Sequence, residues 1–600
     1  MEAIRAVRPR LDRWYVWALV FFAIAGTRAI ALGQSMFAAD GAYDRYINYV
    51  AAAAVNAGYL PYRDFTFLHP PGVILWLTPF AWLGQAFGDH VGFGAAKVFV
   101  LLLTSAAFTL LAWSVRRLGI WASIAVALVA IVHGQEAGVD VRPELEAFYN
   151  PAFIIGMVVL GVALQHSLRH PLAKADDPDP AATGLTTREV SALPRDDPAA
   201  TTGLPRPGGR AKIAVRTAPL VIAGALFGIA GVTKIVVGGP IVVVLVFVGI
   251  AAGWRAVAKI CAGGLVAAVA IAGPFVAQAP VLAFDMIVRT QFGRAIESGA
   301  LRNHLGPLSA LPAPVLTAGI LGVALVLVTA VLWHAARRPG LGWGWAWVGV
   351  GVIELGTLLV TPAHYGDYNA LLTAPMAIGC AYAVAWLTRG IPRERRRLLV
   401  PAVAAAGAVL IAAVGVRPIR PPYFHPKAPV YSLAALTSAL QNDRCVLGLP
   451  GDILIYTDRL SRDLRAGCPF IVDATGIRLA GTLGVPTPEA ARWQTSTGTK
   501  AVLAAGKAAG IVVTNRGKSG VNKAFFNSSA WQVEAHAGLP APWVVFGPAA
   551  RTDDEPLPAA PPPTRTLAPT EPRSAAQPVH VDRDDDGHER HHHDADEDRD

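Results

Sequence analysis

Residues 14–32 read WYVWALVFFAIAGTRAIAL, an apolar run of the length that an α-helix needs to cross a lipid bilayer. Four arginines precede this run, and no small-residue cleavage site of the signal-peptide kind follows it. Similar runs recur along the 600 residues, of which 53% are hydrophobic and only 16% are charged. In soluble domains about a quarter of the residues are charged. The sequence therefore predicts a polytopic membrane protein and excludes an ordinary soluble enzyme.

The apolar runs predict about eleven membrane-spanning helices. After 14–32 these cover residues 92–114, 119–134, 151–168, 217–233, 235–252, 257–279, 309–333, 342–361, 370–388 and 398–416. A shorter run at 73–87 contains Pro79, and we interpret it as a helix that lies in the membrane interface. With this interpretation, segments on the inner side carry 23 Lys and Arg and the outer loops carry 7. The positive-inside rule then predicts a cytoplasmic N-terminus (1–13) and an extracytoplasmic C-terminus.

Polar segments define the remaining organisation. Residues 33–91 are expected to form the first extracytoplasmic loop, with interfacial helices, and 169–216 a disordered cytoplasmic loop. In 417–550, four apolar runs read as buried strands of a small α/β domain: CVLGL (445–449), PFIVDA (469–474), GIVVTN (510–515) and WVVFG (543–547). The acidic, His-rich tail 551–600 is expected to be disordered. The predicted fold is an all-α polytopic membrane bundle (14–416) with a C-terminal extracytoplasmic α/β domain.

Two of the four cysteines, Cys445 and Cys468, lie in the predicted outer domain. Because disulfides persist outside the cytoplasm, we expect these two to be joined. The alternative is a pair of separate buried thiols.

Ionisable residues gather in the loops assigned to the outer face, where they are candidates for function. The first loop carries acidic residues, bases and His69, the second carries Asp140 and Glu144, and Lys234 stands alone between two apolar runs. Such a surface fits a substrate with an anionic head, an apolar tail and an acceptor hydroxyl. A carboxylate would take the proton of the hydroxyl, and bases would hold the phosphate. An apolar groove would hold the isoprenoid chain.

The stretch YDRYINYVAAAAVNAGYLPYRDFTFLHPPG (43–72) resembles the first outer loop of the GT-C glycosyltransferase superfamily. It is similar to actinobacterial multi-pass transferases related to protein O-mannosyltransferases, with an Asp after helix 1, a Gly about fourteen residues later, PYRDF and a Pro-Pro-Gly run. GVTKIVVGGP (231–240), AHYGDYNALLTAP (363–375) and YTDRLSRDLRAGCPFIVDATG (456–476) resemble later family segments. One departure is the absence of the Asp-Asp or Asp-Glu pair often found in this loop.

The resemblance implies an inverting transferase with a loop aspartate as general base. Asp44 matches by its spacing to Gly58, and Asp40 matches because it follows the helix end directly. Either residue could instead cap the helix that begins near Tyr43. The residues assigned to donor phosphate or lipid binding are Lys234, Arg63, His69, His364, Tyr365 and Arg28. Those assigned to acceptor binding or loop support are Asp64, Asp140 and Glu144.

Most of these assignments have an ordinary structural alternative. Glu144 and its neighbour Glu146 could be ordinary loop charges. Asp64 could order its loop, His69 could fix the turn before two prolines, and Lys234 could snorkel to the membrane surface. His364 and Tyr365 could belong to an interfacial belt. Arg28 could serve helix packing or the donor.

The leading hypothesis is a membrane glycosyltransferase, a hexosyl- or pentosyltransferase of cell-envelope biogenesis. It would take its sugar from a polyprenyl-phosphate donor, decaprenyl phosphate being one such carrier, and use an envelope glycan, lipid or protein as acceptor. No cofactor, no metal site and no nucleic-acid partner is expected, because no ligand cluster with metal spacing occurs and the basic residues lie in membrane-flanking loops. The alternative is a transporter or flippase of lipid-linked sugar, which would carry repeats and charges at mid-membrane depth.

Overall fold

The chain is described here from a computed structural model. The residues that the structure describes are 13–32, 43–136, 143–169, 215–294, 343–361, 368, 370–389, 440, 445–449, 451–509, 511–515, 531–535 and 543–548. The expected helices 309–333 and 398–416 and the segment 551–600 lie outside these residues, as does nearly all of 169–216.

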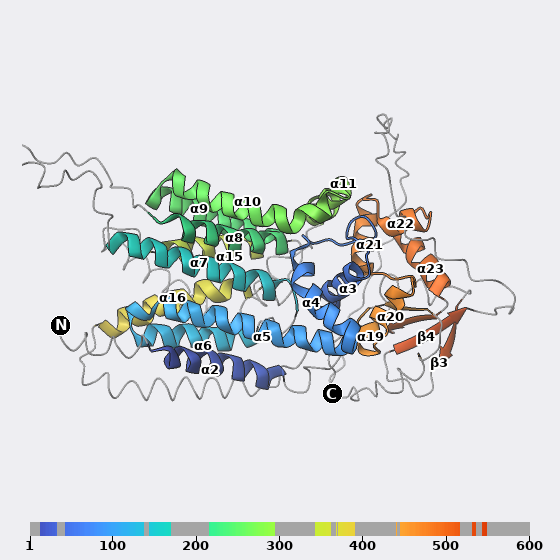
Figure 1. The fold of residues 1–600 in the computed structure, drawn as a ribbon, viewed down its shortest axis with the longest axis horizontal. Coiled ribbons are helices and arrows are strands. Elements are labelled where there is room, and N and C mark those ends of the chain that lie inside the picture. Colours follow the sequence, from blue (N-terminus) through green and yellow to red (C-terminus); the bar gives the residue numbers. More distant parts are fainter. Residues whose placement is uncertain are drawn as a thin grey trace, which may run out of the picture. The chain divides into compact units, whose positions relative to one another are not determined.

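The described part of the chain up to residue 389 is helical (Figure 1). Its longer helices are α2 (Trp14–Leu32), α3 (Tyr43–Asn56), α4 (Gly72–Phe87), α5 (Asp89–Ser114), α6 (Ile120–Glu136), α7 (Glu146–Arg169), α8 (Thr217–Thr233), α9 (Gly238–Ala252), α10 (Trp254–Val276), α15 (Gly344–Val360) and α16 (Ala370–Arg389). Short helical turns are η2 (Arg116–Leu118), η5 (Ile235–Val237), α11 (Pro280–Phe284), η6 (Asp285–Arg289) and α12 (Thr290–Phe292).

Nine of the eleven runs interpreted as membrane helices coincide with described helices, because long apolar periodic runs are the strongest helix signal. The bounds agree for α2 and α8, and the run 73–87 forms α4. Among the described residues, four helical stretches are long and apolar enough to cross a membrane: Asp89–Leu118, Glu146–Leu164, Ile235–Ala252 and Trp254–Val276. Other apolar helices, such as Trp14–Ile30, are shorter than that limit.

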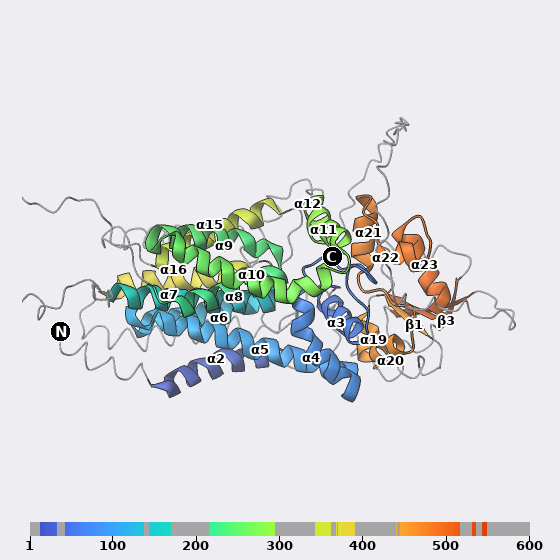
Figure 2. The same ribbon diagram turned by 45° about the horizontal axis from the view of Figure 1, so that its top comes forward.

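The helices pack through small residues and aromatic rings. α2 lies beside α5 and α6, and α8 lies between α7 and α10 (Figures 1 and 2). The α8–α10 crossing is close, since a Cβ on Gly224 would lie 2.0 Å from the backbone oxygen of Ile260. Close backbone approach at small residues is the usual way in which helices associate within a bilayer.

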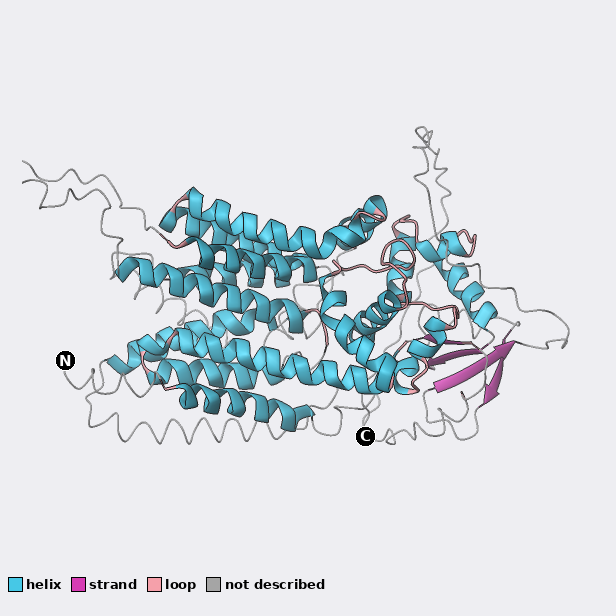
Figure 3. Ribbon diagram, viewed as in Figure 1, coloured by secondary structure: helices cyan, strands magenta, loops and turns pink. Residues whose placement is uncertain are grey.

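The C-terminal part of the described chain is an α/β unit (Figure 3). Its sheet has the order β1-β2-β4-β3, with β1 and β2 parallel and the other neighbours antiparallel. The strands are β1 (Val446–Leu449), β2 (Ile511–Asn515), β3 (Trp531–Ala535) and β4 (Trp543–Pro548). The helices are α19 (Asp452–Tyr456), α20 (Leu460–Arg465), α21 (Ala474–Thr482), α22 (Pro488–Arg492) and α23 (Gly498–Ala509). Together α19 to α23 form the crossover that a parallel β1–β2 pair requires.

The sequence-based expectation of a strand at 469–474 is wrong. This segment is irregular, although Phe470, Ile471 and Val472 are all buried. Phe470 packs against the first loop, with its ring centroid 4.7 Å from that of Tyr59, and Asp473 caps α21 by accepting from the Gly476 amide. A continuous apolar run indicates burial, and here the burial comes from loop contacts and not from a strand ladder.

Cys445 and Cys468 are joined by a disulfide that links the start of β1 to the segment before α21. The bond closes a loop with a sequence separation of 23 residues. It therefore fixes the irregular segment that contacts the first loop to the sheet.

Candidate functional site

The PYRDF turn of the first loop holds a backbone conformation that side chains rarely adopt. Tyr62 has φ of 68° and is fully buried. Its amide donates to the Phe65 oxygen at 3.0 Å, and its hydroxyl donates to the His69 oxygen at 2.7 Å. Strained conformations of this kind persist where the surrounding structure enforces them, and they cluster at functional sites. The turn thus sets the position of His69.

Arg63 and Asp64 support the loop through each other. The Arg63 Nη2 lies 2.7 Å from the Asp64 Oδ2, and Nε lies 3.1 Å from Oδ1, so the pair is bidentate. Asp64 also accepts from the Leu60 amide at 2.7 Å, and its backbone oxygen accepts from Arg492. These contacts favour the loop-ordering role for Asp64, and they hold the guanidinium of Arg63 against a carboxylate.

His69 lies where the first loop meets the end of α8. Three residues after it, Gly72 approaches α8 so closely that a Cβ would lie 2.6 Å from the Val232 oxygen. Gln291 donates to the Leu68 oxygen at 2.8 Å and brings the 290–294 segment to the same place. Burial, then the positive charges of Lys234 and Arg294, lowers the pKa of His69 to about 3. At neutral pH it is therefore a neutral imidazole beside two cations.

Lys234 follows α8 in extended backbone and forms an ion pair with Glu146 at the start of α7. Both side chains are largely buried, at 12% and 5% exposure. The ammonium also lies 4.0 Å from the ring centroid of Tyr368 and 6.0 Å from that of Tyr149. The ammonium of Lys234 is therefore held at the end of α8 by a carboxylate and two aromatic rings. Glu146 was not among the predicted site residues.

Of the two candidate bases, Asp44 lies in the first turn of α3, and Asp40 lies outside the described residues. One helical turn after Asp44, Asn48 donates to the Pro143 oxygen at 3.5 Å, next to the buried Glu144. The beginning of α3 therefore lies against the segment that leads into α7. The side chain of Asp44 is not among those described.

Asp140, His364 and Tyr365 also lie outside the described residues. Arg28 is buried on α2, where it donates to the Ser105 hydroxyl at 3.3 Å and the Ala130 oxygen at 3.4 Å. It also lies over the ring of Phe108. These contacts connect α2 to α5 and α6, and none of them reaches the first loop, so they favour the packing role.

Hydrogen bonds to buried carboxylates hold the α/β unit against the first loop. Glu489 accepts from the Thr66 amide at 2.8 Å and from its hydroxyl at 2.5 Å. Burial raises the pKa of Glu489, although the bonds from Thr66 oppose this effect. A second clamp lies at the start of α5, where Asp89 accepts from the amide and hydroxyl of Ser461. The domain is thus bound to the loop that carries the candidate base.

We predict that Asp473→Asn makes the thermal stability of the chain less dependent on pH. Burial, with a further contribution from Glu489, raises the pKa of Asp473 from 3.8 to about 7, against the opposing Gly476 hydrogen bond. A carboxyl with a raised folded-state pKa loses its stabilising contribution as pH rises from about 4 to about 7. Asparagine keeps the helix cap but does not ionise. Relative to wild type, the variant should gain thermal stability between pH 5 and pH 8, at about 2–4 °C per kcal/mol.

Thermal unfolding of the full chain in detergent, followed by tryptophan fluorescence at both pH values, is the measurement. A difference between variant and wild type that is the same at both pH values would contradict the assignment.

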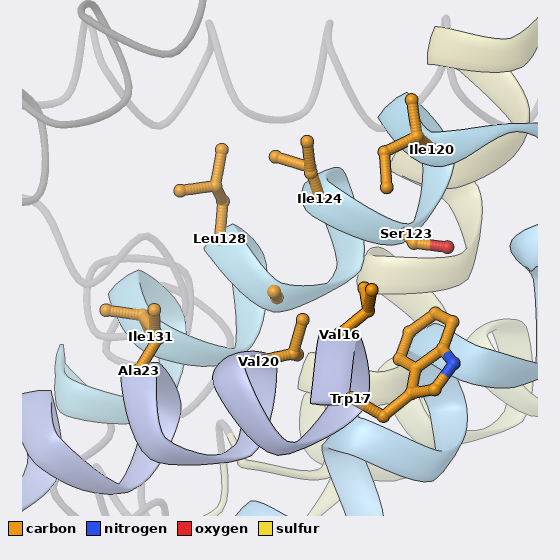
Figure 4. Close-up of a pocket in the computed structure, with 10 residues that line it drawn as sticks. Val16, Trp17, Val20, Ala23, Ile120, Ser123, Ile124, Leu128 and Ile131 are labelled. Carbon is orange, nitrogen blue, oxygen red and sulfur yellow. The ribbon is translucent and has the colours of Figure 1, made fainter. Parts of the chain in front are cut away.

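A cavity of about 200 Å³ lies between α2 and α6 (Figure 4). Its walls are apolar, formed by Val16, Trp17, Val20 and Ala23 on α2 and by Ile120, Ser123, Ile124, Ala127, Leu128 and Ile131 on α6. Ser123 donates its hydroxyl to the Ala112 oxygen. The cavity therefore suits a hydrocarbon chain, and no charged residue lines it.

Several site residues escaped sequence reasoning. Glu354 lies within an apolar run and Tyr149 lies just before one. Thr66 and Glu489 are 423 positions apart, so no local pattern joins them. Within the described part of the chain, no group of three His, Cys, Asp or Glu could hold a metal ion.

No family model matches the chain, and no curated protein matches it. Among solved structures it is similar to ArnT from Cupriavidus metallidurans bound to undecaprenyl phosphate, with 15% identity and TM-score 0.47, over 90% of this chain and 99% of that one. It is also similar to the oligosaccharyltransferase of Archaeoglobus fulgidus tethered to an acceptor peptide, with 13% identity and TM-score 0.48, over 84% and 69%. Because the identities and TM-scores are this low, these likenesses do not establish what the chain does.

Proposed function

We propose that this chain is an integral-membrane glycosyltransferase that moves a sugar, with inversion, from a polyprenyl-phosphate donor to an extracytoplasmic cell-envelope acceptor. The observation that carries the proposal is that His69, just before α4, lies within electrostatic reach of Lys234 at the end of α8 and of Arg294. A neutral hydrogen-bonding imidazole near two cations suits a phosphate diester, and the apolar helices suit its isoprenoid chain.

In this proposal Lys234 and Arg294 bind the donor phosphate and stabilise it as a leaving group. Glu146 holds Lys234 in place. Asp44 is the general base that takes the proton of the acceptor hydroxyl while that oxygen attacks the anomeric carbon, and Asp40 is the second choice. His364 and Tyr365 would contact the donor, and Asp140 and Glu144 the acceptor side. No cofactor takes part.

The α/β unit and the membrane orientation belong to the same proposal. Since Glu489 and Ser461 hold the unit to the first loop, it would orient the acceptor beside the base. The distribution of Lys and Arg supports a position of this unit outside the cell, with the N-terminus inside. On the basis of the motif in the first loop, the proposed subclass is the actinobacterial type related to protein O-mannosyltransferases.

The experiment is a donor screen. Membranes containing the chain are incubated with decaprenyl phosphate that carries radiolabelled mannose, arabinose or galactose. The proposal expects one donor to pass its label into material that organic solvent no longer extracts. Absence of transfer from every polyprenyl-phosphate sugar, with the chain folded and the membranes supplied with envelope acceptors, would overturn it.

A further inference from the structure

A pair of buried polar groups lies next to Lys234 and takes no part in the mechanism above. Glu354 on α15 is 3% exposed and Tyr149 on α7 is 1% exposed. Within the described part of the chain, the Glu354 Oε2 and the Tyr149 hydroxyl have no hydrogen-bond partner. Buried polar atoms without partners are rare and costly, so such a pair suggests a missing ligand.

Glu354 and Tyr149 lie within electrostatic reach of each other, in a region where α7 packs against α15. The ring of Phe153, one turn after Tyr149, packs at 6.3 Å against the ring of Trp347, which lies seven residues before Glu354 on the same face of α15. Seven residues make about two helical turns, so Glu354 lies on the same face of α15 as Trp347, two turns closer to the start of α7. Tyr149 is within electrostatic reach of Glu146, Glu354 and Tyr368.

The phosphate anchor adjoins the pair. Lys234 lies over the Tyr149 ring and pairs with Glu146, one turn from Tyr149. Five residues after Lys234, a Cβ on Gly239 would lie 2.9 Å from Ile353, the neighbour of Glu354. A group attached to a phosphate on Lys234 therefore comes within reach of Glu354 and Tyr149.

We propose that Glu354 and Tyr149 form the sugar-recognition subsite of the donor, accepting and donating hydrogen bonds to its ring hydroxyls. The inference rests on the proposed function, because it takes the phosphate on Lys234 as given. A carboxylate oxygen accepts from hydroxyls, and a phenol both donates and accepts.

The test compares two lipids that differ only in the sugar. Binding of decaprenyl phosphate and of the decaprenyl-phosphate sugar selected in the donor screen is measured for the purified full chain by native mass spectrometry. Glu354→Gln and Tyr149→Phe should each weaken binding of the sugar-bearing lipid about tenfold to hundredfold. The loss of a hydrogen bond to a charged or buried group has an effect of this size. Binding of the bare lipid should stay within about twofold.

Val352→Ala, on the exposed face of α15, is the matched control and should change neither affinity. Size-exclusion and thermal unfolding profiles identify folded variants, and Tyr149→Phe provides a second reading if Glu354→Gln misfolds. If the variants lose affinity equally for both lipids, or lose affinity for neither, the subsite is overturned. If wild type binds neither lipid, the proposed function fails, and the subsite fails with it.

Discussion

Asp44→Asn is expected to lose nearly all sugar transfer while still binding the donor lipid. An acceptor hydroxyl is a weak nucleophile until a base takes its proton, and general-base catalysis contributes about 10²–10⁴-fold. Asparagine keeps the size and hydrogen bonding of the side chain but cannot accept that proton. The loss should therefore fall on kcat, with donor affinity near wild type. Initial rates of transfer from radiolabelled donor, with protein amounts matched by blotting, measure it.

Asp40→Asn is the matched control, because it removes a carboxylate from the same loop four residues away. It should lose less activity than Asp44→Asn. A dead Asp40 variant beside an active Asp44 variant would reverse the assignment within the loop. If both variants stay active, neither aspartate is the general base. The transporter alternative would then be the better explanation.

Replacement of Lys234 should instead weaken donor binding. Lys234→Met removes the ammonium that would hold the phosphate, which should weaken binding of decaprenyl phosphate about tenfold to hundredfold. The single variant also leaves Glu146 buried without its cation, and breaking a buried pair costs about 3–5 kcal/mol. The informative protein is therefore the double variant Lys234→Met with Glu146→Gln.

The double variant should fold like wild type and still bind the lipid about tenfold to hundredfold more weakly. Glu146→Gln alone is its control, because it keeps the ammonium, and it should bind decaprenyl phosphate within about tenfold of wild type. Wild-type lipid affinity in the folded double variant would exclude Lys234 as the phosphate anchor.

The helices were predictable where burial and periodicity coincide. Two predicted ranges, 14–32 and 217–233, match α2 and α8 at both ends. The sheet was less predictable. The edge strand β3 reads WQVEA, and the alternation of polar and apolar residues over five positions is too short to identify. The apolar run 469–474 was wrongly predicted as a strand, since Phe470 packs on the first loop and Ile471 joins the buried core that β1 and β2 share.

The candidate site was predictable only where charge stands out against an apolar background. Lys234 is such a residue, and so is His69 beside its prolines. Glu146 looked like an ordinary loop charge until the ion pair with Lys234 placed it in the site. Glu354 lies inside an apolar run, where its position against α7 depends on tertiary packing. Residues that acquire a role through long-range contacts carry no local signal.

The most direct test of the central claim follows the sugar itself. The purified chain is reconstituted into vesicles that contain a decaprenyl-phosphate sugar labelled in the sugar, together with envelope acceptor. A glycosyltransferase separates label from lipid, so the label should move to the acceptor and unlabelled decaprenyl phosphate should accumulate in equal amount. Asp44→Asn should suppress both changes. If the label stays on the lipid and merely crosses the bilayer, the chain is a transporter of lipid-linked sugar, and the glycosyltransferase account is contradicted.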